Sequence, residues 1–413
     1  MRIIIENQSF SLQGGTEVVS VATYSTLKKY GHDVYFFSTD KKPYYIENYE
    51  YAKYFPKDNL NTIGYLKNPF KYFWNWEAAN KLEQMIKDIN PDIIHFNALI
   101  SPSILQVCKK NNIPAIMTIH MMPSHCPAVK LLFRNKIICS DFKCKNGNYW
   151  HCILNKCGNG SIERSIRKSL LSYIYDITGV YSAISYFICP SQALRDYARQ
   201  TSICKDKNKI ITINNFLRDD ELKTIPNYTN KGYFLYIGRL DREKGVNYLL
   251  EAIKDLPREI EVHIVGKGSE EEKLKQYAKE NNLENVKFLG FKNREEIKEE
   301  YQNCISTVLP CNWFENFPTT NMESFINGKP VIASNIGGIP EQIEHNKTGL
   351  LFEPTNAEQL KKYILNYWNN NDLVVEHGKN AYQKAITQYT EERYYKELVS
   401  IYQKTIQEYK KQE

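Results

Sequence analysis

This sequence contains no long hydrophobic run. Its most apolar stretch, LLSYIYDITGVYSAISYFIC at residues 170–189, includes an aspartate, a glycine and several hydroxyl side chains, and it leads directly into PSQALRDY. A membrane-spanning helix requires about 20 consecutive, predominantly apolar residues. The interruptions therefore argue against a membrane span, and the stretch is typical of a helix followed by a buried strand.

The N-terminal sequence, MRIII, also lacks the features of a secretory signal: a basic start, a long apolar core and a small-residue cleavage site. We therefore expect a cytosolic protein whose ten cysteines are reduced. The sequence has no repeat of solenoid period and no low-complexity segment. It also has no Gly-x-Gly-x-x-Gly, and this absence disfavours an enzyme that uses a nicotinamide dinucleotide.

The size and composition are those of a two-domain globular protein. At 413 residues the chain is too long for one ordinary core, so two domains of roughly 200 residues are expected. The formal charge is +7, but residues 120–210 alone contain 14 Lys and Arg against 5 Asp and Glu. A basic face of this kind suits phosphates or anionic lipid headgroups, so we expect contact with the inner face of the cell membrane.

Short apolar runs alternate with helical patterns along the whole chain. Runs rich in Ile, Val and Phe that are separated by helices predict buried parallel sheets with helices on both faces. The strands expected in the first half are RIIIEN, DVYFFST, PDIIHFN, AIMTIH, YFICPS and KIITINN. Those expected in the second half are GYFLYIGRL, EVHIVGKG, VKFLGF, ISTVLP, PVIAS and TGLLFE. Two such series predict an α/β protein with two doubly wound parallel-sheet domains.

The break between the two series falls in a polar segment, NNFLRDDELKTIPNYTNKG. We therefore predict an N-terminal domain at 1–213, a C-terminal domain at 214–390 and a final helix at 391–413 that crosses back to the first domain. Ligands of paired parallel sheets bind at the carboxyl ends of the strands, so a cleft between the domains is the expected site.

Two glycine pairs follow expected strands and are candidates for binding an anion. Gly14 and Gly15 follow the first strand and can open a helix whose N-terminus accepts a phosphate. An ordinary glycine turn would explain this pair equally well. Gly266 and Gly268 end a strand in the second half.

The segment PCNWFENFPTTNMESFINGKPVIAS holds two glutamates eight residues apart, Glu315 and Glu323. We interpret it as a loop that turns into a helix, because Pro318 suits a first helical turn and Thr319 and Thr320 can cap it. Two acids beside a helix N-terminus fit a ligand that is both polyhydroxylated and anionic. A solvated helix face with a chance acidic pair would give the same spacing.

The second half assembles further features in order. YIGRLDREKG, with Arg239 and Lys244 just after a strand, is followed by IVGKG, FLGF, Glu315 and Glu323, GKPVIASNIGGIPEQI and TGLLF. This set resembles the retaining glycosyltransferases of family 4, which have the two-domain GT-B fold and a recurrent Glu-x7-Glu. The first half agrees in GG-x-E near the N-terminus, PDIIHFN, TIH ending at His120, and ICPSQAL. The resemblance covers nearly the whole chain.

The resemblance implies a nucleotide-diphosphate sugar as the donor and gives these residues their roles. Arg239 and Lys244 would neutralise the charge that develops on the diphosphate leaving group. Glu323 would hold the ribose hydroxyls, and Glu315 would contact the transferred sugar. Pro318, where many relatives have Gly, offers no amide. The other donor-binding positions implied are Gly14, Gly15, Gly266, Asn316 and the backbone amides of Phe317, Thr319 and Thr320.

The resemblance also places His120 near the reacting sugar, although a lone histidine at a strand end is, on pattern alone, more often structural. Such enzymes retain the anomeric configuration, and we assign no covalent nucleophile. The chain has no Asp-x-Asp, and fixed cations can replace a metal at the phosphates, so no cofactor is expected in catalysis. The implied function is transfer from a UDP- or GDP-sugar to a glycan or lipid-linked glycan in bacterial capsule, exopolysaccharide or O-antigen synthesis.

Half of the ten cysteines lie between residues 126 and 157. Four of them, Cys139, Cys144, Cys152 and Cys157, have a near-symmetrical Cys-x4-Cys-x7-Cys-x4-Cys spacing. Thiols in such a series can hold a structural zinc or an iron–sulfur cluster, here in an insertion at about 121–170 beside the acceptor. Reduced cysteines without a metal are an equally good interpretation, because the gaps are wider than the usual Cys-x2-Cys.

Three other functions fit parts of the sequence. A nucleotide-sugar epimerase of the same fold is the first, although Glu-x7-Glu and GRLDREKG favour transfer. A nucleic-acid-binding protein that uses the basic segment and a cysteine knuckle is the second, but residues 120–210 contain no recognised RNA- or DNA-reading motif. A scaffold without activity is the third, and the presence of every expected donor residue speaks against it.

Overall fold

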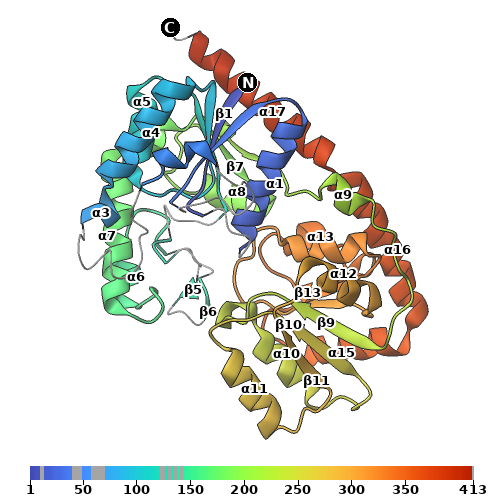
Figure 1. Cartoon of the computed structure of the whole chain (residues 1–413). Coiled ribbons are helices and arrows are strands. Elements are labelled where there is room, and N and C mark those ends of the chain that lie inside the picture. Colours follow the sequence, from blue (N-terminus) through green and yellow to red (C-terminus); the bar gives the residue numbers. More distant parts are fainter. Residues whose placement is uncertain are drawn as a thin grey trace. The chain divides into compact units, whose positions relative to one another are not determined.

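The chain forms two compact units in the computed structural model (Figure 1). The N-terminal unit comprises Met1–Asn214 together with Tyr394–Glu413, and the C-terminal unit comprises Asn215–Arg393. The insertion was expected at about 121–170, and most of its residues before residue 143 lie outside the described part of the chain. The structure describes residues 1–9, 14–39, 49–56, 70–120, 126–128, 132–133, 137–139 and 143–411.

The N-terminal unit is built on a parallel sheet of six strands in the order β2-β1-β3-β4-β7-β8. Ile, Val and Phe dominate most of these strands because helices bury both faces of a parallel sheet. The strands are β1 (Arg2–Glu6), β2 (Asp33–Phe37), β3 (Ile93–Phe96), β4 (Ala115–Thr118), β7 (Tyr186–Cys189) and β8 (Ile210–Thr212). A separate antiparallel pair consists of β5 (Leu132–Phe133) and β6 (Ile137–Ile138).

Helices connect these strands, and several begin at a polar cap. The helical elements are α1 (Gly15–Lys29), η1 (Glu50–Tyr54), α3 (Phe70–Phe73), α4 (Trp76–Ile89), α5 (Pro102–Lys110), α6 (Trp150–Leu154), α7 (Ile162–Thr178), η2 (Val180–Ala183), α8 (Gln192–Arg199), η3 (Lys207–Lys209) and α17 (Glu391–Lys410). Asn75, Ser101, Ser161 and Ser191 each accept a hydrogen bond from an amide in the first turn of α4, α5, α7 and α8. These side chains satisfy amides that have no acceptor inside the helix, which fixes where the helices start.

The C-terminal helix, α17, packs on the N-terminal unit from Tyr394 onward. Its Tyr402 hydroxyl lies 2.7 Å from Nδ1 of His95 in β3, and its Tyr394 hydroxyl lies 2.9 Å from Oγ1 of Thr23 in α1. Both pairs are buried. The regular tyrosines of this helix therefore hold it to the first sheet and its covering helix.

The C-terminal unit repeats the same plan with a parallel sheet in the order β11-β10-β9-β12-β13-β14. Its strands are β9 (Tyr233–Ile237), β10 (Glu261–Val265), β11 (Val286–Gly290), β12 (Thr307–Leu309), β13 (Val331–Ser334) and β14 (Gly349–Phe352). Its helical elements are α9 (Asp219–Leu222), η4 (Arg242–Lys244), α10 (Val246–Ile253), α11 (Glu271–Glu280), α12 (Arg294–Asn303), α13 (Thr319–Ile326), α14 (Ile339–Gln342), α15 (Ala357–Asn369) and α16 (Asn371–Gln388).

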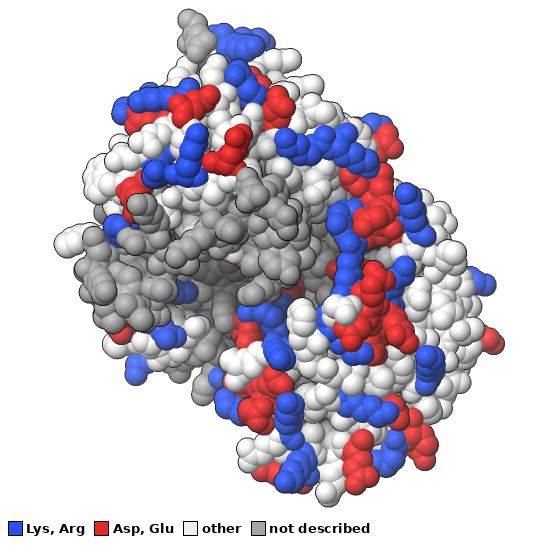
Figure 2. All heavy atoms as spheres, in the orientation of Figure 1, with Lys and Arg blue, Asp and Glu red and all other residues white. Residues whose placement is uncertain are grey.

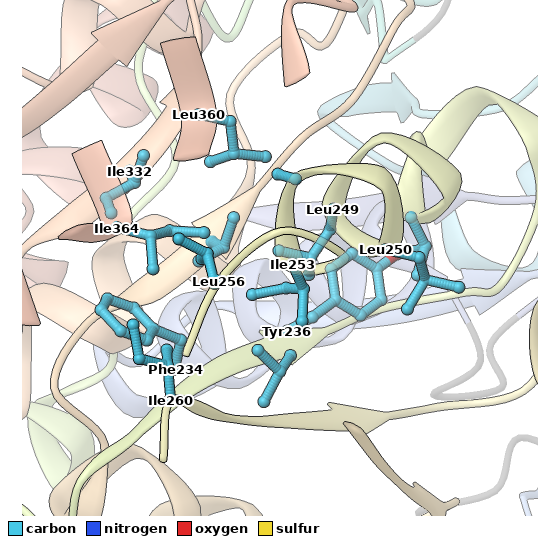
Figure 3. Packing of buried hydrophobic residues seen from close by; sticks show 14 of the residues in the cluster. Phe234, Tyr236, Leu249, Leu250, Ile253, Leu256, Ile260, Ile332, Leu360 and Ile364 are labelled. Atoms are coloured by element: carbon cyan, nitrogen blue, oxygen red, sulfur yellow. The ribbon is translucent and has the colours of Figure 1, made fainter. Parts of the chain in front are cut away.

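The core of the C-terminal unit lies between the sheet and helices α10 and α15 (Figure 3). Phe234 and Tyr236 of β9 share this cluster with Ile253 of α10 and with Leu360 and Ile364 of α15. Each is at most 1% exposed. Burying an aliphatic or aromatic side chain of this size contributes about 1.5–3 kcal/mol, so this packing fixes the sheet from which the loops of the site emerge.

All twelve strands expected from the sequence are present, and the α/β class with two doubly wound parallel sheets is confirmed. Residues 170–189 contain the end of α7, then η2 and β7, which is the predicted helix followed by a strand. The β5–β6 pair was not predicted, because two-residue strands give no periodic signal. Within the described part of the chain, no helix combines the length and apolar character needed to cross a membrane.

Candidate functional site

Loops at the carboxyl edge of the second sheet are held together by glycines that lack room for a side chain. Gly245, which ends η4, has a φ of +69°, and a Cβ there would lie 1.9 Å from the carbonyl oxygen of Pro310. Gly266 follows β10, and a Cβ there would lie 1.9 Å from the carbonyl oxygen of Gly238. The loops after β9, β10 and β12 therefore approach backbone to backbone, which brings distant side chains to one place.

Lys244 and Glu315, both predicted site residues, form an ion pair at this edge. Their side chains are 16% and 10% exposed, and the Lys244 ammonium also lies 5.0 Å from the centre of the Trp313 ring. A largely buried pair of this kind is screened by water less than a surface pair. The site therefore holds a fixed cation beside a fixed carboxylate.

Gly337 and Gly338 fix the backbone of Glu315. The Gly338 amide donates to the Glu315 carbonyl oxygen at 2.8 Å. Gly337 has a φ of +61°, and a Cβ there would lie 2.1 Å from the same oxygen. A side chain at Gly337 would displace Glu315, so Gly337 is a residue of the site. The sequence motif GKPVIASNIGGIPEQI contains this glycine but gave it no role.

Arg239 lies in the same region but makes different contacts. Its guanidinium pairs with Asp241 at 2.6 Å and with Glu243 at 3.8 Å, and its side chain is half exposed. Its ion pairs are thus with acids of its own loop, whereas Lys244 reaches across to the loop after β12. The two predicted cations are therefore not equivalent.

The helix after Glu315 starts one residue later than expected. Pro318 is the N-cap of α13, with extended backbone angles, and Thr319 and Thr320 are its first two helical residues. The interpretation of the threonines as caps is therefore wrong, because both lie inside the helix and the cap position is held by a proline, whose side chain offers no acceptor to the first-turn amides. The amides of Thr319 and Thr320 belong to the first turn, where a helix has no acceptor of its own. Asn316 and Phe317 lie in the preceding loop.

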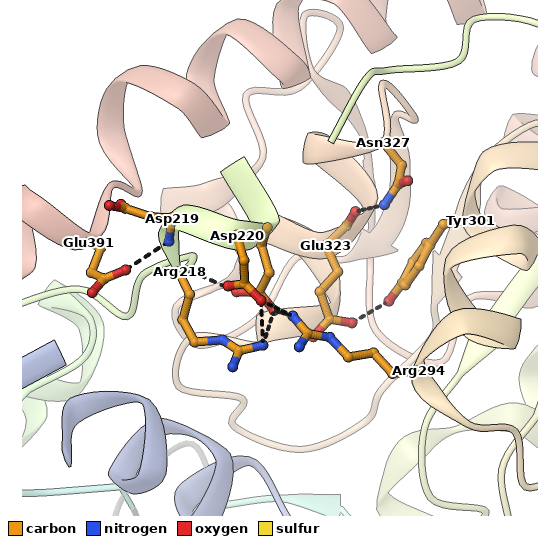
Figure 4. A network of polar contacts seen from close by, with 9 residues as sticks. Arg218, Asp219, Asp220, Arg294, Tyr301, Glu323, Asn327 and Glu391 are labelled. Atoms are coloured by element: carbon orange, nitrogen blue, oxygen red, sulfur yellow. Dashed lines mark hydrogen bonds and ion pairs between the residues drawn. The ribbon is translucent and has the colours of Figure 1, made fainter. Parts of the chain in front are cut away.

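Glu323 lies in α13, away from the loop of Glu315, and accepts a hydrogen bond from the Tyr301 hydroxyl at 2.8 Å (Figure 4). Burial and the nearby Glu221 carboxylate raise the pKa of Glu323, while the bond from Tyr301 lowers it by a smaller amount. Arg294 donates to Glu221 at 3.0 Å and opposes the rise in pKa. Sequence reasoning found Glu323 but missed Tyr301, Glu221 and Arg294, which lie on other elements.

In the N-terminal unit, Gly14 and Gly15 lie at the start of α1. Gly14 is the N-cap, Gly15 is the first helical residue, and the Gly14 carbonyl accepts the first helical hydrogen bond, from Val18 at 3.1 Å. A Cβ on Gly15 would meet no atom within 4 Å. Gly14 differs, because a Cβ there would clash with the Glu17 carboxylate, which lies beside this helix N-terminus. An anion-binding role for the pair stays a prediction.

His120 follows β4, and its Nε2 lies 3.1 Å from the side-chain oxygen of Asn97, which follows β3. Burial lowers the pKa of His120 to about 4, so its imidazole is neutral near pH 7.

Glu6, at the end of β1, is fully buried and accepts a hydrogen bond from the Ile100 amide at 2.9 Å. Burial raises the pKa of Glu6 well above its usual value. Glu6 and Asn97 were missed, although an acid that ends the apolar run RIIIE was a visible signal.

The cysteines of the expected metal site lie near one another. Burial and the neighbouring thiols of Cys126, Cys139 and Cys157 raise the pKa of Cys144 to about 12, and a hydrogen bond from Cys157 lowers the pKa of Cys152. No disulfide is formed in the described part of the chain. Among the described residues, no group of three or more His, Cys, Asp or Glu side chains is arranged to hold a metal ion. Zinc or an iron–sulfur cluster at the four thiols stays a prediction, which metal analysis of the purified protein tests.

Comparison with protein-family models matches both halves of the chain. Residues 13–221 match Glycosyltransferase Family 4, and residues 218–384 match Glycosyl transferases group 1. The first of these matches covers half of the chain.

Comparison with curated proteins finds relatives in Methanocaldococcus jannaschii and in bacteria. The chain is 26% identical to an uncharacterized glycosyltransferase of Haemophilus influenzae over 88% of this chain and 89% of that protein. It is 32% identical to the amylovoran biosynthesis glycosyltransferase AmsK of Erwinia amylovora over 40% of this chain and 43% of that protein. It is 27% identical to the O-antigen chain mannosyltransferase C of Escherichia coli over 41% of this chain and 46% of that protein. Except for the Haemophilus influenzae protein, the chain spans about half the length of the curated relatives it matches.

Solved structures show the same fold. Sucrose-phosphate synthase from Thermosynechococcus elongatus matches with a TM-score of 0.72 and 17% identity over 98% of both chains. Anabaena HepE, solved in complex with UDP-glucose, matches with a TM-score of 0.69 and 18% identity over 97% of this chain and 99% of that chain. These likenesses establish the GT-B fold. Together with the family match over half of its residues, they show that the chain belongs to glycosyltransferase family 4.

Proposed function

We propose that the chain transfers a sugar from a nucleotide-diphosphate sugar to a glycan acceptor, and that the anomeric configuration of the sugar is retained. The observation that carries this proposal is the largely buried ion pair of Lys244 and Glu315 in the loops next to α13. A fixed ammonium can stabilise charge that develops on a departing diphosphate, and a fixed carboxylate can accept hydrogen bonds from sugar hydroxyls.

The remaining residues of the C-terminal unit suit the rest of such a donor. The amides of Thr319 and Thr320 in the first turn of α13 can donate to phosphate or sugar oxygens. Glu323, held by Tyr301, can accept hydrogen bonds from the ribose hydroxyls. Arg239 contributes a more exposed positive charge. We assign His120 and Gly15 to the side of the reacting sugar because of their places in the family pattern.

The names of similar proteins support a particular donor and acceptor. HepE was solved with UDP and with UDP-glucose, so a uridine donor is tested first. AmsK is named for amylovoran biosynthesis, and the mannosyltransferase for the O-antigen chain. We therefore propose a UDP- or GDP-sugar donor and a glycan or lipid-linked acceptor in surface polysaccharide synthesis. The transfer proceeds without a divalent ion, because Lys244 supplies the charge at the phosphates.

The test of the donor class is thermal stabilisation of the full chain by UDP, GDP, ADP and CMP, each with and without EDTA. Binding of one nucleotide family to the folded state raises the unfolding temperature, and the rise grows with nucleotide concentration. We expect such a rise with one diphosphate and no change with EDTA. No rise with any nucleotide would contradict the proposal, and a rise abolished by EDTA would contradict its metal independence.

The reaction class is tested by incubating the stabilising donor with and without glycan acceptors and recording anomeric proton signals by NMR. Transfer with retention gives a glycoside with the donor's anomeric configuration, and only when acceptor is present. Conversion of the donor sugar without acceptor would identify an epimerase instead.

A further inference from the structure

Three polar side chains lie at the carboxyl edge of the first sheet, and only one of them, His120, has a place in the proposed reaction. Strands β1, β3 and β4 are neighbours in this sheet, so the residues that follow them share one edge. Glu6 ends β1, Asn97 comes directly after β3, and His120 lies two residues after β4. Glu6 and Asn97 are buried, whereas His120 is partly exposed. Two enclosed polar groups therefore lie behind one side chain that reaches the surface of the unit.

The contacts of Asn97 fix the direction of its side-chain amide. Its Nδ2 lies 3.5 Å from the backbone carbonyl oxygen of Glu6, which can only accept a hydrogen bond. The amide nitrogen must therefore face Glu6, and the amide oxygen faces His120. The Asn97 backbone amide also donates to the Glu6 carbonyl oxygen, at 2.9 Å, and holds the residue in place.

This orientation decides where the hydrogen of the His120 ring lies. The side-chain oxygen of Asn97 lies 3.1 Å from Nε2 of His120, and an amide oxygen cannot donate. Nε2 must therefore carry the hydrogen. Burial lowers the pKa of His120 to about 4, so near pH 7 the ring has only this one hydrogen on its nitrogens. Asn97 thus selects one of the two neutral tautomers of His120.

The side chain of Glu6 holds the loop that carries Asn97. The Ile100 amide donates to Glu6 Oε1 at 2.9 Å, and both residues are at most 5% exposed. Burial raises the pKa of Glu6 well above its usual value, and the amides of Ile100, Ala98 and Asn97 lower it by less. The balance favours the neutral acid, whose Oε1 still accepts from Ile100.

An acid at this position is costly for the fold. Oε2 of Glu6 has no hydrogen-bond partner among the described residues, and a buried polar atom without a partner destabilises the folded state. An apolar residue at the end of RIIIE would avoid this cost but would leave the buried Ile100 amide without an acceptor. The acid therefore fixes the loop after β3 at the expense of stability, which is typical of a functional position.

We propose that Glu6 and Asn97 are positioning residues for the sugar transfer. Glu6 holds the loop after β3, and Asn97 in that loop orients the His120 ring and keeps its hydrogen on Nε2. The inference rests on the proposed function, in which His120 acts on the side of the reacting sugar. A ring whose angle and tautomer are already fixed needs no reorganisation during the reaction, so loss of either support should lower turnover and not donor affinity.

The direct test needs no donor and reads the His120 ring by NMR of the full chain with isotope-labelled histidine. The sequence has eight histidines, so the signal that disappears in His120→Gln is assigned to His120. We expect a hydrogen on Nε2 near pH 7. In Asn97→Leu its exchange with water should become at least about tenfold faster, because the acceptor is gone. A hydrogen on Nδ1 in the unmodified chain, or unchanged exchange in Asn97→Leu, would overturn the proposal.

The second test is the kinetics of sugar transfer. Asn97→Leu should lower turnover about 10-fold to 100-fold and leave the affinity for the stabilising nucleotide, UDP or GDP, within about twofold. Glu6→Leu should act in the same direction. Glu6→Gln is its matched variant, because it keeps an oxygen for the Ile100 amide, and it should retain turnover within about threefold. Equal losses in Glu6→Leu and Glu6→Gln would overturn the role of Glu6.

A double variant separates positioning from a general effect on folding. If Asn97 acts through His120, Asn97→Leu should reduce turnover by less than about twofold further in a chain that already carries His120→Ala. The same loss in both backgrounds would mean that Asn97 acts separately from His120, and the proposal would fail. Absence of transfer from any nucleotide sugar would contradict the proposed function instead, and the exchange of the His120 hydrogen would still decide whether Asn97 holds the ring.

Discussion

The two units share one architecture but differ in charge. Each is a six-stranded parallel sheet covered by helices. The N-terminal unit contains 31 Lys and Arg against 19 Asp and Glu, whereas the C-terminal unit contains 23 against 28. Figure 2 shows the two signs interspersed over the C-terminal unit. Because the same fold forms with either balance, the net charge does not decide the fold.

The two units also contain positive charges in different environments. In the C-terminal unit, which is acidic overall, Lys244 is largely buried and fixed by Glu315. In the basic unit, Lys156 and Arg164 are exposed. A buried, oriented charge suits chemistry at one point of a small ligand. If this is the role of Lys244, the largest losses of activity should come from the donor loops, and smaller effects should come from the packing around them.

The largest effect is expected from Lys244→Met. The substitution keeps an alkyl chain over Trp313 but removes the ammonium, so the rate of sugar transfer should fall by about 10²–10³-fold. The measurement is the turnover number with saturating donor. Arg242→Ala is the control, because Arg242 lies in the same short helix, η4, with an exposed side chain. It should change turnover little.

A drop in turnover after Lys244→Met could also follow from leaving Glu315 buried without a partner. The double variant Lys244→Met with Glu315→Gln removes that unpaired charge and should regain the thermal midpoint of the unmodified chain. It should nevertheless stay inactive. Activity within about threefold of the unmodified chain in either variant would show that Lys244 does not act on the leaving group.

Substitution of Glu323 and Glu315 is expected to have smaller effects than Lys244→Met, and the two variants should lose different properties. Glu323→Gln should weaken nucleotide binding by about 10-fold to 100-fold, because a hydrogen-bond acceptor for the ribose is replaced by an amide. Glu315→Gln should mainly lower turnover and leave nucleotide affinity close to that of the unmodified chain. Calorimetric titration with the nucleotide and steady-state kinetics separate the two. Equal losses of affinity and turnover in both variants would contradict the division of roles.

The strands of both units could be predicted from the sequence because burial in a parallel sheet leaves a direct signature. A strand with both faces covered must be apolar at nearly every position, so RIIIEN or PVIAS is recognisable without knowledge of its neighbours. The charged helices α11 and α12 were recognisable from their apolar spacing. Pro318 was placed one position too far into its helix, since capping depends on backbone angles that the residue types do not determine.

The contacts of the site could not be predicted to the same degree. Lys244 and Glu315 were named separately, but their pairing depends on Gly245 and Gly337, which let three loops approach closely. Glu6 was missed because burial is a tertiary property, and an acid at the end of a strand is more often exposed.

A moderate effect that depends on pH is expected from His95 in the N-terminal unit. Burial lowers the pKa of His95 to about 3, from an ordinary value of 6.5. Between these values the unfolded chain binds a proton that the folded chain does not, so stability falls as pH falls below 6.5. The loss due to this one group is about 2 kcal/mol near pH 5. His95→Gln should be less stable at neutral pH but should lose less stability on acidification, as measured by the thermal midpoint across pH.

Tyr402→Phe is the matched variant for His95→Gln. Both lose the hydrogen bond between His95 and Tyr402, but only His95→Gln loses the group that titrates. Tyr402→Phe should therefore keep the steep dependence on pH. An equally steep dependence in His95→Gln would mean that other groups cause the acid sensitivity.

The smallest effect is expected from Arg294→Gln, which tests whether the acidic surface of the C-terminal unit reaches the donor site. Arg294 pairs with Glu221 at 3.0 Å and is half exposed, so its loss should cost less than about 1 kcal/mol of stability. Arg294 also holds down the pKa of Glu323, while Glu221 raises it. Without Arg294 the pKa of Glu323 rises further, and the decline of nucleotide affinity on acidification should begin at higher pH.

The control is Lys298→Gln, which removes an exposed positive charge from the same helix and should leave that pH profile unchanged. Identical pH profiles for both variants would show that Glu323 is isolated from the surface network, and its pKa would then depend on burial and on the hydrogen bonds from Tyr301 and Thr319.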